Sequence, residues 1–380
     1  MRAGTPVDEV ALLTYSTRPR GGVVHTLALA EALAELGVAV TVWSLGRGGD
    51  TGFFRAVDRR VRLRVVPLPE IPGETVGERV LRSIGVLSAA LAADPPLGVV
   101  HAQDCISANA AGACIRTVHH VDHFTTPQLV SCHERAIREP YAHVCVSGAV
   151  AGELRRGWGI EAEVIPNGVD SGRFAAPDPA AVRGWRDRLG TYVLSVGGIE
   201  PRKGSVTLLD AYARLRRSRP DAALVIAGGE TVFDYREYRA RWEARAVELG
   251  IEPVVLGPVE DGEMPSLVAA ASAFAFPSEK EGFGLAAMEA LAAGVPVVVS
   301  DLPVLRETFS GAVEFAPDAP SLADALRRAL AGRDTGRAER GRRLAARYTW
   351  KAAAAAHLEL YHRLGARNCA AAGARGTMRA

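Results

Sequence analysis

The part of this sequence that most constrains its fold is the stretch 271–299, in which two strand patterns enclose a helix pattern. Ala271 to Phe276 is an apolar run that stops at Pro277, as a buried strand would. Leu285 to Ala293 is rich in strong helix formers, and Val295 to Val299 is a second apolar run. A strand, a helix and a strand in this order predict a βαβ unit of a parallel sheet.

The loop between the first strand and the helix predicts a binding site. It contains Gly282 and Gly284, which leave backbone N–H groups accessible before the positive end of the helix. Such a helix end suits an anion such as a diphosphate. Two carboxylates, Glu281 and Glu289, flank this position, and a carboxylate there is better suited to accept hydrogen bonds from hydroxyl groups. The combination indicates a pocket for a nucleotide sugar rather than for a bare phosphate.

Strand and helix patterns alternate along the chain in two series. The first begins with the apolar run Val10 to Tyr15, and a loop with Gly21 and Gly22 leads into a helix pattern. This glycine pair fits either a close approach to a ligand or a tight turn. The second series begins with Tyr192 to Val196, followed by the glycine loop Gly197 to Gly204. The alternation predicts an α/β protein with two doubly wound parallel sheets.

The length of 380 residues also fits two domains. One segment rich in Ala, Pro, Asp and Arg is typical of a connection, and the last residues lack any apolar period. We therefore expect a domain at 1–170, a linker at 171–190, a second domain at 191–349, a helix at 350–364 and a disordered tail at 365–380.

A lysine in the second glycine loop is a candidate catalytic residue. The chain has only three lysines, Lys203, Lys280 and Lys351, so Lys203 in a loop after a strand is conspicuous. A cation there can offset the charge that builds up on a leaving diphosphate. The neighbouring Arg202 could share this task. The other interpretation is a pair of solvated loop side chains.

A histidine cluster follows one strand pattern of the first series. His119 closes an apolar run, and Asp122 lies just beyond it. A histidine at a strand end can hydrogen-bond a sugar hydroxyl or exchange a proton near neutral pH, although a satisfied polar cluster would explain the pattern equally well. His101, His120 and His123 lie on different loops without the spacing of metal ligands, so we expect no metal site.

Composition and patterning exclude several classes of protein. A net charge of +2 gives no basis for nucleic acid binding, and five cysteines without Cys-x-x-Cys spacing predict neither a disulfide framework nor a zinc site. No apolar run resembles a signal peptide or a membrane span, so we expect a cytoplasmic protein. The aromatic and basic stretch Phe53 to Arg64 suits either contact with anionic lipid or a helix end that leads into a half-exposed strand.

Several of these residues resemble the signatures of a known family. Glu281 to Glu289 resembles the glutamate, seven residues, glutamate signature of the family 4 retaining glycosyltransferases, also called glycosyltransferases group 1. Val164 to Asp170 (Val-Ile-Pro-Asn-Gly-Val-Asp) is similar to a second hallmark, and Gly21-Gly22 and Pro201 to Gly204 match in order. The resemblance covers about residues 8–361, and its motifs are specific when taken together.

The resemblance implies the GT-B fold, in which two Rossmann-like domains face an inter-domain cleft and the last helix crosses back to complete the first. The second domain would bind a nucleotide diphosphate sugar, a UDP- or GDP-sugar, as the donor substrate. The first would bind the acceptor, which would be a small molecule, a glycan or a lipid. Neither a cofactor nor a metal would be needed, and closure of the cleft would exclude water.

The resemblance also implies a role for each matching residue. Lys203 would contact the diphosphate, Glu289 the ribose hydroxyls and Glu281 the hydroxyls of the transferred sugar, while His119 would be the cleft histidine beside Asp122. The remaining candidates would contribute mainly backbone groups: Phe283, Gly284, Leu285 and Ala286 for sugar and phosphate, Gly257 and Val259 along the base, and Gly21 and Gly22 for phosphate or acceptor.

The chain departs from the family pattern at Gly198, where many members have an arginine that shares the diphosphate with the lysine. Loss of such a charge-assisted contact costs roughly 1.5–3 kcal/mol unless another group replaces it. Arg202 is the candidate replacement. Without one, a protein that binds nucleotide sugars but does not catalyse transfer is the main alternative.

A nicotinamide-dependent oxidoreductase is the second alternative, because two wound domains would suit it. That class requires a G-x-G-x-x-G turn after the first strand, with an acidic residue about 20 positions further on. Neither Gly21-Gly22 nor Gly197-Gly198 has this spacing.

Overall fold

The computed structural model describes residues 7–122, 124, 126–229, 235–332 and 334–376, with side chains up to residue 365. It divides into two compact units. The first unit contains the described residues up to Val146, residues Val150–Gly168 and those from Trp350 onward. The second contains Ser147–Ala149 and Val169–Thr349.

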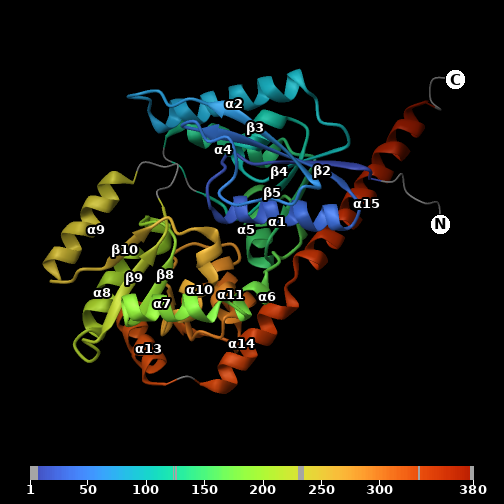
Figure 1. Cartoon of the computed structure of the whole chain (residues 1–380). Coiled ribbons are helices and arrows are strands. Elements are labelled where there is room, and N and C mark those ends of the chain that lie inside the picture. The colour runs from blue at the N-terminus through green and yellow to red at the C-terminus, as the bar shows by residue number, and fades with distance from the viewer. Residues whose placement is uncertain (1–6, 123, 125, 230–234, 333, 377–380) are drawn as a thin grey trace. The chain divides into compact units, whose positions relative to one another are not determined.

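The sheet of the first unit is parallel throughout, with seven strands among the described residues in the order β3-β2-β1-β4-β5-β6-β7 (Figure 1). Its strands are β1 (Glu9–Leu13), β2 (Ala39–Arg47), β3 (Val61–Leu68), β4 (Val99–Ala102), β5 (Ile115–Val118), β6 (Ala142–Cys145) and β7 (Glu163–Val164). Both faces of β1 are buried, because Val10 and Leu12 belong to one core cluster and Ala11 and Leu13 to another.

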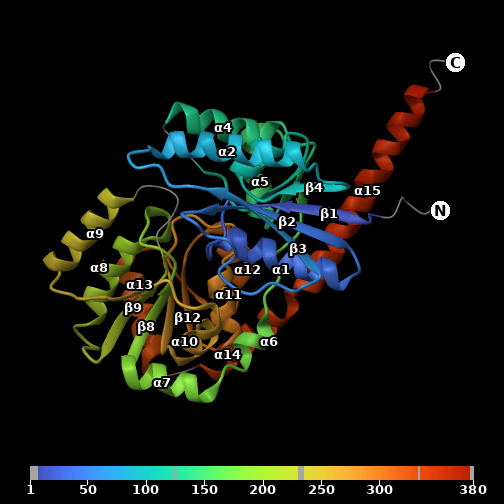
Figure 2. The same ribbon diagram turned by 45° about the horizontal axis from the view of Figure 1, so that its top comes forward.

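Helices cover both of these faces. The helices of the unit are α1 (Gly21–Glu35), α2 (Val76–Ala93), α3 (Cys105–Ala111), α4 (Pro127–Arg138), α5 (Gly148–Trp158) and α15 (Trp350–Gly376). Helices α1 and α15 pack against each other on the Val10 face, and α2, α3 and α4 cover the Leu13 face (Figures 1 and 2). In the part of the chain that the structure describes, no helix combines the length and apolarity needed to cross a membrane.

The second unit has a parallel sheet of its own, with six strands in the described residues in the order β10-β9-β8-β11-β12-β13. Its strands are β8 (Thr191–Val196), β9 (Ala222–Ala227), β10 (Val254–Gly257), β11 (Ala273–Phe276), β12 (Val297–Ser300) and β13 (Glu314–Ala316). Two parallel sheets of this kind confirm the predicted α/β class.

Helices also cover both faces of this second sheet. They are α6 (Ser171–Ala175), α7 (Pro179–Leu189), α8 (Ser205–Leu215), α9 (Arg236–Glu248), α10 (Met264–Ala270), α11 (Leu285–Ala292), α12 (Pro303–Phe309), α13 (Ala319–Ala331) and α14 (Thr335–Arg347), with 3-10 turns η1 (Pro201–Lys203) and η2 (Asp261–Glu263). Helices α8, α9 and α13 share one core cluster with alternate residues of the strands. The βαβ unit expected at 271–299 is present as β11, α11 and β12.

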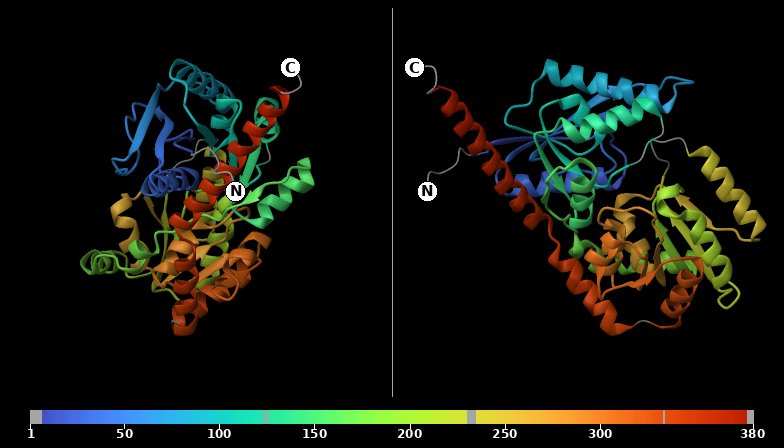
Figure 3. Two further views of the ribbon diagram at one scale, coloured as in Figure 1. Left: turned by 90° about the vertical axis from the view of Figure 1, so that its right-hand side faces the viewer. Right: turned by 180° about the vertical axis from the view of Figure 1, so that it is seen from behind.

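Two segments differ from the expectation. Residues 171–190, expected as a linker, instead form α6 and α7, which pack against α10 in the second unit. Helix α15 does not end at Leu364 but continues to Gly376, so the expected disordered tail is helical over 365–376 (Figure 3). Residues 377–380 lie outside the described residues.

The strand order places a topological switch point in each sheet. Strand β1 is followed in sequence by β2 on one side and is flanked by β4 on the other, and β8 has the same relation to β9 and β11. In open parallel sheets, ligands bind at the carboxyl ends of the strands at such a point. The loops after β8 and β11 are therefore where the second unit should bind a ligand.

Candidate functional site

The loops after β8 and β11 bring two of the predicted residues into direct contact. Lys203 Nζ lies 2.5 Å from Glu281 Oε1, and the same oxygen accepts hydrogen bonds from Arg202 Nη1 at 3.2 Å and from Ser278 Oγ at 3.2 Å. The Lys203 ammonium also lies 4.9 Å from the centre of the Phe276 ring, a cation–π distance. The structure thus joins the lysine loop and the first glutamate of the signature into one site.

A second carboxylate completes this ionic network. Arg202 Nη2 donates to Glu200 Oε1 at 3.0 Å, and Glu200 is 7% exposed. Two cations therefore face two carboxylates, so this network has no net charge when all four groups are ionised. Burial lowers the pKa of Lys203, with Arg202 acting in the same direction, while Glu281 and Glu200 oppose the shift.

A left-handed glycine fixes the end of the lysine loop. Gly204 has φ +62°, and its N–H donates to the carbonyl of Pro201, which closes η1. A β-carbon at this position would lie 2.0 Å from the carbonyl oxygen of Pro277, in the loop after β11. The two loops approach this closely only because residue 204 has no side chain.

Replacing Gly204 by alanine should therefore destabilise the second unit and separate the two loops. The left-handed φ alone costs about 1–2 kcal/mol, and the clash with Pro277 adds to it. We expect the melting temperature to fall by roughly 4–8 °C, measured by circular dichroism. Gly184→Ala, inside α7 with open space around the added carbon, is the matched control and should leave the melting temperature unchanged or higher. A Gly204→Ala protein as stable as the parent would contradict this account.

Glycines also end three neighbouring strands of the second unit. The N–H of Gly197 donates to the carbonyl of Ala227, and the N–H of Gly228 donates to the carbonyl of Gly257, both at 2.8 Å. A β-carbon on Gly228 would lie 2.4 Å from backbone atoms of Gly197. The predicted base-binding residues Gly257 and Val259 follow this edge. No side chain fits between the strand ends at Gly197 and Gly228, so a cation for the site has to come from a loop beyond them.

The start of α11 forms the other wall of the site. Gly284 has φ +95°, and a β-carbon there would lie 2.8 Å from the ring of Phe309. The side chain of Phe283 is buried and makes an edge-to-face contact with Tyr348 at 5.3 Å. Phe283 therefore contributes only backbone to the site, as do Leu285 and Ala286 in the first turn of the helix. This arrangement leaves the positive helix end toward the loop.

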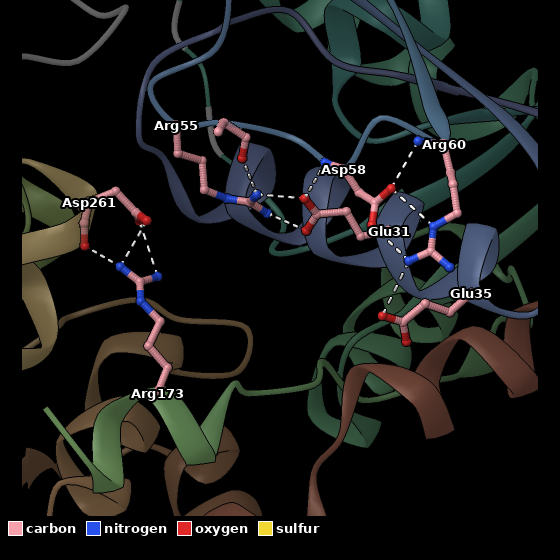
Figure 4. Close-up of polar contacts among 8 residues, drawn as sticks. Glu31, Glu35, Arg55, Asp58, Arg60, Arg173 and Asp261 are labelled. Carbon is pink, nitrogen blue, oxygen red and sulfur yellow. Dashed lines mark hydrogen bonds and ion pairs between the residues drawn. The ribbon is translucent and has the colours of Figure 1, made fainter.

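Glu289 lies one turn into α11 near three charged groups, of which Asp170 belongs to the second hallmark. Although part of Glu289 is accessible, burial raises its pKa to about 8; Arg173 opposes this, and Asp261 and Asp170 reinforce it. Arg173 is engaged elsewhere, because its Nη2 lies 2.8 Å from Asp261 Oδ2 (Figure 4). Asp170 caps α6 by accepting from the N–H of Arg173 at 3.1 Å. The carboxyl of Glu289 is therefore mostly protonated at neutral pH.

The remaining predicted residues lie in the first unit. A β-carbon on Gly22, in the first turn of α1, would lie 3.7 Å from the His119 ring, so this glycine and this histidine are neighbours. Asp122 lies 3.1 Å from His120. Burial lowers the pKa of His119 to about 3, with further contributions from His120 and Arg116, so its imidazole is neutral at physiological pH. His123 lies outside the described residues.

The stretch Phe53 to Arg64 does not present its aromatic groups to solvent. Phe53 and Phe54 pack against the core cluster that includes α1. Arg55 makes two hydrogen bonds of 2.7 Å with Glu31 on α1, and Arg60 pairs with Asp58 at 2.7 Å (Figure 4). The stretch leads into the edge strand β3, as the second interpretation predicts, but residues 53–60 form no helix end.

The predicted site residues therefore form two groups, one in each unit. Lys203, Arg202, Glu281 and Glu289 lie with the α11 start in the second unit, whereas Gly22, His119 and Asp122 lie in the first. Within the described ranges, no group of three or more His, Cys, Asp or Glu side chains is arranged to hold a metal ion.

Three supporting residues were not among the residues predicted from the sequence. Glu200 and Ser278 belong to the ionic network, and Asp261 pairs with Arg173. Glu200 and Ser278 adjoin motifs that were recognised, so their position beside Arg202 and Glu281 was the available signal. Nothing in the sequence around Asp261 distinguishes it from an ordinary loop aspartate.

Family models match both halves of the chain. Residues 19–173 match "Glycosyltransferase Family 4", and residues 188–346 match "Glycosyl transferases group 1". The chain is 32% identical over 286 residues to a glycogen synthase of Mycobacterium tuberculosis, which is 70% of this chain and 63% of that protein. It is also 32% identical over 228 residues to a phosphatidyl-myo-inositol mannosyltransferase of Mycolicibacterium smegmatis, covering 57% of this chain and 56% of that protein. The chain thus matches less than two thirds of the length of either relative.

A solved structure supports the same fold. Anabaena HepE, in complex with UDP and glucose, matches with a TM-score of 0.72 and 19% identity over 93% of this chain and 98% of that chain. Its likeness bears on the fold alone, because the identity is low. Together with the two Rossmann-like sheets and the glutamate signature at Glu281 and Glu289, the two family matches lead to one conclusion: the chain belongs to the family 4, or group 1, glycosyltransferases with the GT-B fold.

Proposed function

We propose that this protein transfers a sugar from a nucleotide diphosphate sugar to a hydroxyl group of an acceptor, with retention of configuration and without a metal. The observation that supports this most is the 2.5 Å contact between Lys203 Nζ and Glu281 Oε1 at the switch point between β8 and β11. A cation and a hydrogen-bond acceptor lie side by side where such sheets bind ligands. A donor requires both, because its diphosphate is anionic and its sugar carries hydroxyl groups.

In this proposal Lys203 and Arg202 stabilise the leaving group. Negative charge builds up on the diphosphate oxygen as its bond to the anomeric carbon breaks, and a preorganised cation favours that transition state. In the unliganded protein both cations are paired with Glu200 and Glu281. We infer that the diphosphate replaces Glu281 as the partner of Lys203, which leaves Glu281 to accept hydrogen bonds from the sugar. Arg202 thereby supplies the positive charge that an arginine at position 198 supplies in many family members.

The other contacts with the donor follow from placing its diphosphate beside Lys203 and Arg202. The N–H groups of Gly284 to Ala286 would bind phosphate and sugar at the positive end of α11. Glu289 would accept from the ribose hydroxyls, and the strand end at Gly257 to Val259 would lie along the base. Anabaena HepE, one of the solved structures of this fold, was crystallised with UDP and glucose, so a UDP-sugar is a convenient first donor to test beside a GDP-sugar.

Retention, as the family suggests, would come from attack by the acceptor on the face from which the diphosphate leaves. The bond from the anomeric carbon to the diphosphate oxygen breaks, a bond to the acceptor oxygen forms on the same face, and the acceptor proton passes to the departing diphosphate. No carboxylate is needed as a base in this scheme, so Glu281 is available to accept hydrogen bonds from the hydroxyl groups of the sugar. Neutral His119 would hydrogen-bond a substrate hydroxyl without carrying charge. The acceptor would be a small molecule, a glycan or a lipid.

Thermal shifts with UDP, GDP, ADP and dTDP and their sugars test the donor. The true donor should raise the melting temperature most, because a ligand at 100 times its dissociation constant stabilises the folded state by about 2.7 kcal/mol. The matching nucleosides serve as controls and should shift it less, since they lack the diphosphate that Lys203 and Arg202 would bind. If no nucleotide or nucleotide sugar shifts the melting temperature, the proposal fails. Turnover that EDTA abolishes and a divalent cation restores would contradict the metal-independent part.

A non-catalytic protein that binds nucleotide sugars is the second candidate. The observation in its favour is the balanced network of two cations and two carboxylates, combined with Gly198 in place of an arginine. Tight binding of a nucleotide with no hydrolysis or transfer from any donor would favour it over the enzyme.

A further inference from the structure

Three buried histidines in the first unit have no role in the reaction proposed above, and one of them contacts His119. His25 on α1, His101 at the end of β4 and His357 on α15 are each at most 1% exposed. His25 is the member that touches His119 directly, because their ring centres are 4.8 Å apart and their planes cross at 78°. Three buried imidazoles beside the partly exposed His119 are unusual, since a buried polar ring costs free energy unless its partners are arranged for it.

The hydrogen bond of His25 defines its tautomer. Its Nδ1 lies 2.9 Å from the side-chain oxygen of Asn167, which is 4% exposed. A carbonyl oxygen only accepts, so His25 donates from Nδ1 and its Nε2 carries the lone pair. Asn167 belongs to the Val164–Asp170 hallmark, so this hydrogen bond connects the hallmark to α1. The ring plane of His25 is thus set by a residue from a distant part of the chain.

Two aromatic side chains of α15 pack against the ring of His25. Trp350 packs edge-on against it with 5.4 Å between ring centres, and His357 lies 6.1 Å away. The His357 Nδ1 contacts the carbonyl of Ala353 at 2.8 Å, within the same helix. Because α1 and α15 pack side by side, as Figures 1 and 3 show, His25 is enclosed between Asn167, α15 and His119. Its ring has little freedom to turn.

Burial keeps every ring of this group neutral. Burial lowers the pKa of His25 well below its ordinary value, and His119 and His357 act in the same direction, while Asn167 opposes them. Burial lowers the pKa of His357 to about 4 and that of His101 as well. His120 and Arg116 add to the effect on His119. Because burial disfavours a proton on each of these rings, His119 faces Gly22 as an uncharged ring.

We propose that His25, held in one tautomer by Asn167 and backed by Trp350, is a positioning residue that fixes the ring of His119 for its contact with substrate. This inference rests on the role of His119 in the proposed function. His25 itself touches no reacting group; it acts through the edge-to-face contact with His119. Supporting residues of this kind hold a functional side chain within the narrow range of orientations that its reaction needs.

The test reads the histidine rings directly by NMR of ring nitrogens labelled with ¹⁵N, in the full-length protein without ligand. In the parent protein, His25 should carry its proton on Nδ1, and His119 should stay neutral between about pH 5 and 8. His25→Asn keeps a donor near the position of Nδ1 but removes the ring edge that contacts His119. Asn167→Ala removes the acceptor instead. In both variants the ring of His119 should sample more than one orientation, so its ring-nitrogen signals should move or broaden.

Activity gives an independent readout. With the donor identified by thermal shift, each variant should lower kcat by roughly 10–100-fold with little change in the donor KM, because a misplaced group weakens the transition state more than the bound donor. In a double-mutant cycle, His25→Asn should cost little more once His119→Ala is present, since a positioning role is lost with its target. A merely structural role would give additive losses.

The control is His143→Gln, which alters another buried histidine, on β6, whose Nε2 contacts the carbonyl of Ile137. This variant should leave the His119 signals unchanged. Any loss of kcat that it causes should add to the loss caused by His119→Ala. The inference is overturned if His25 carries its proton on Nε2 in the parent protein, a measurement that needs no variant to fold. It is also overturned if the ring-nitrogen signals of His119 in Asn167→Ala are the same as in the parent protein. Full activity of His119→Ala alone would instead refute the proposed role of His119.

Discussion

Replacing Lys203 by alanine is expected to lower kcat by roughly 10²–10³-fold, the usual effect of removing one preorganised group that stabilises developing charge. The ammonium lies 2.5 Å from Glu281 and rests on the Phe276 ring, so it is fixed before the donor binds. Affinity for the free nucleoside should change little, because a nucleoside carries no diphosphate. Steady-state kinetics with the best donor, together with titration of the nucleoside, separates the two effects.

Two further variants control this experiment. Lys351→Ala removes an exposed lysine on α15 and should leave kcat unchanged. Lys203→Arg keeps the charge but not the fit, because a β-carbon built on Gly197 lies only 3.2 Å from Lys203 Cε and the side chain has a narrow path. It should retain only part of the activity. Unchanged kcat in Lys203→Ala would remove this residue from the leaving-group role.

The second large effect concerns Glu289 and pH. Replacing Glu289 by glutamine should weaken nucleotide binding roughly 10–100-fold, the loss of a charge-assisted contact of about 1.5–3 kcal/mol with the ribose. The pKa of Glu289 in the free protein is raised to about 8, so below that pH the carboxyl must lose a proton before it can accept from both ribose hydroxyls. Affinity of the parent protein should therefore increase as the pH rises toward about 8 and level off above it.

Calorimetric titration between about pH 7 and 9 tests this, since the phosphate groups have already lost their second proton near pH 6. The sign is specific: loss of the proton from Lys203 at higher pH would weaken binding rather than strengthen it. Glu289→Gln should abolish the rise, and Asp261→Asn should move it to lower pH, because Asp261 raises the pKa of Glu289 and holds Arg173 away from it. A pH-independent affinity in the parent protein would be the contrary result.

The sequence predicted the second half of the site well because its chemistry is local. The start of α11 at Leu285 follows from Gly284, and the turn at Lys203 follows from Gly204, so backbone requirements alone locate both. The contact between Lys203 and Glu281 then follows from strand order, since β8 and β11 are neighbours. Carboxyl ends of adjacent parallel strands have to meet at one edge.

The sequence did not predict residues whose role depends on distant contacts. His25 lies in an alanine- and leucine-rich helix pattern, where a lone histidine indicates no partner, and Asn167 lies 142 positions away. Their hydrogen bond exists only because the chain returns to α1 after the whole first sheet. Helices α6 and α7 were missed for another reason: their segment is rich in Ala, Pro, Asp and Arg, a composition typical of a connection, and no residue of α7 is fully buried.

The packing of α15 has a consequence for how the protein is made. Tyr361 is 1% exposed and hydrogen-bonds His101 at 2.7 Å, across 260 positions of the chain. The second unit, from Val169 to Thr349, leaves the ribosome as one nearly continuous segment, whereas the first unit cannot close its core until α15 has been synthesised. During translation the face of the first sheet that α1 covers therefore lacks the contribution of α15 until the second unit has been synthesised.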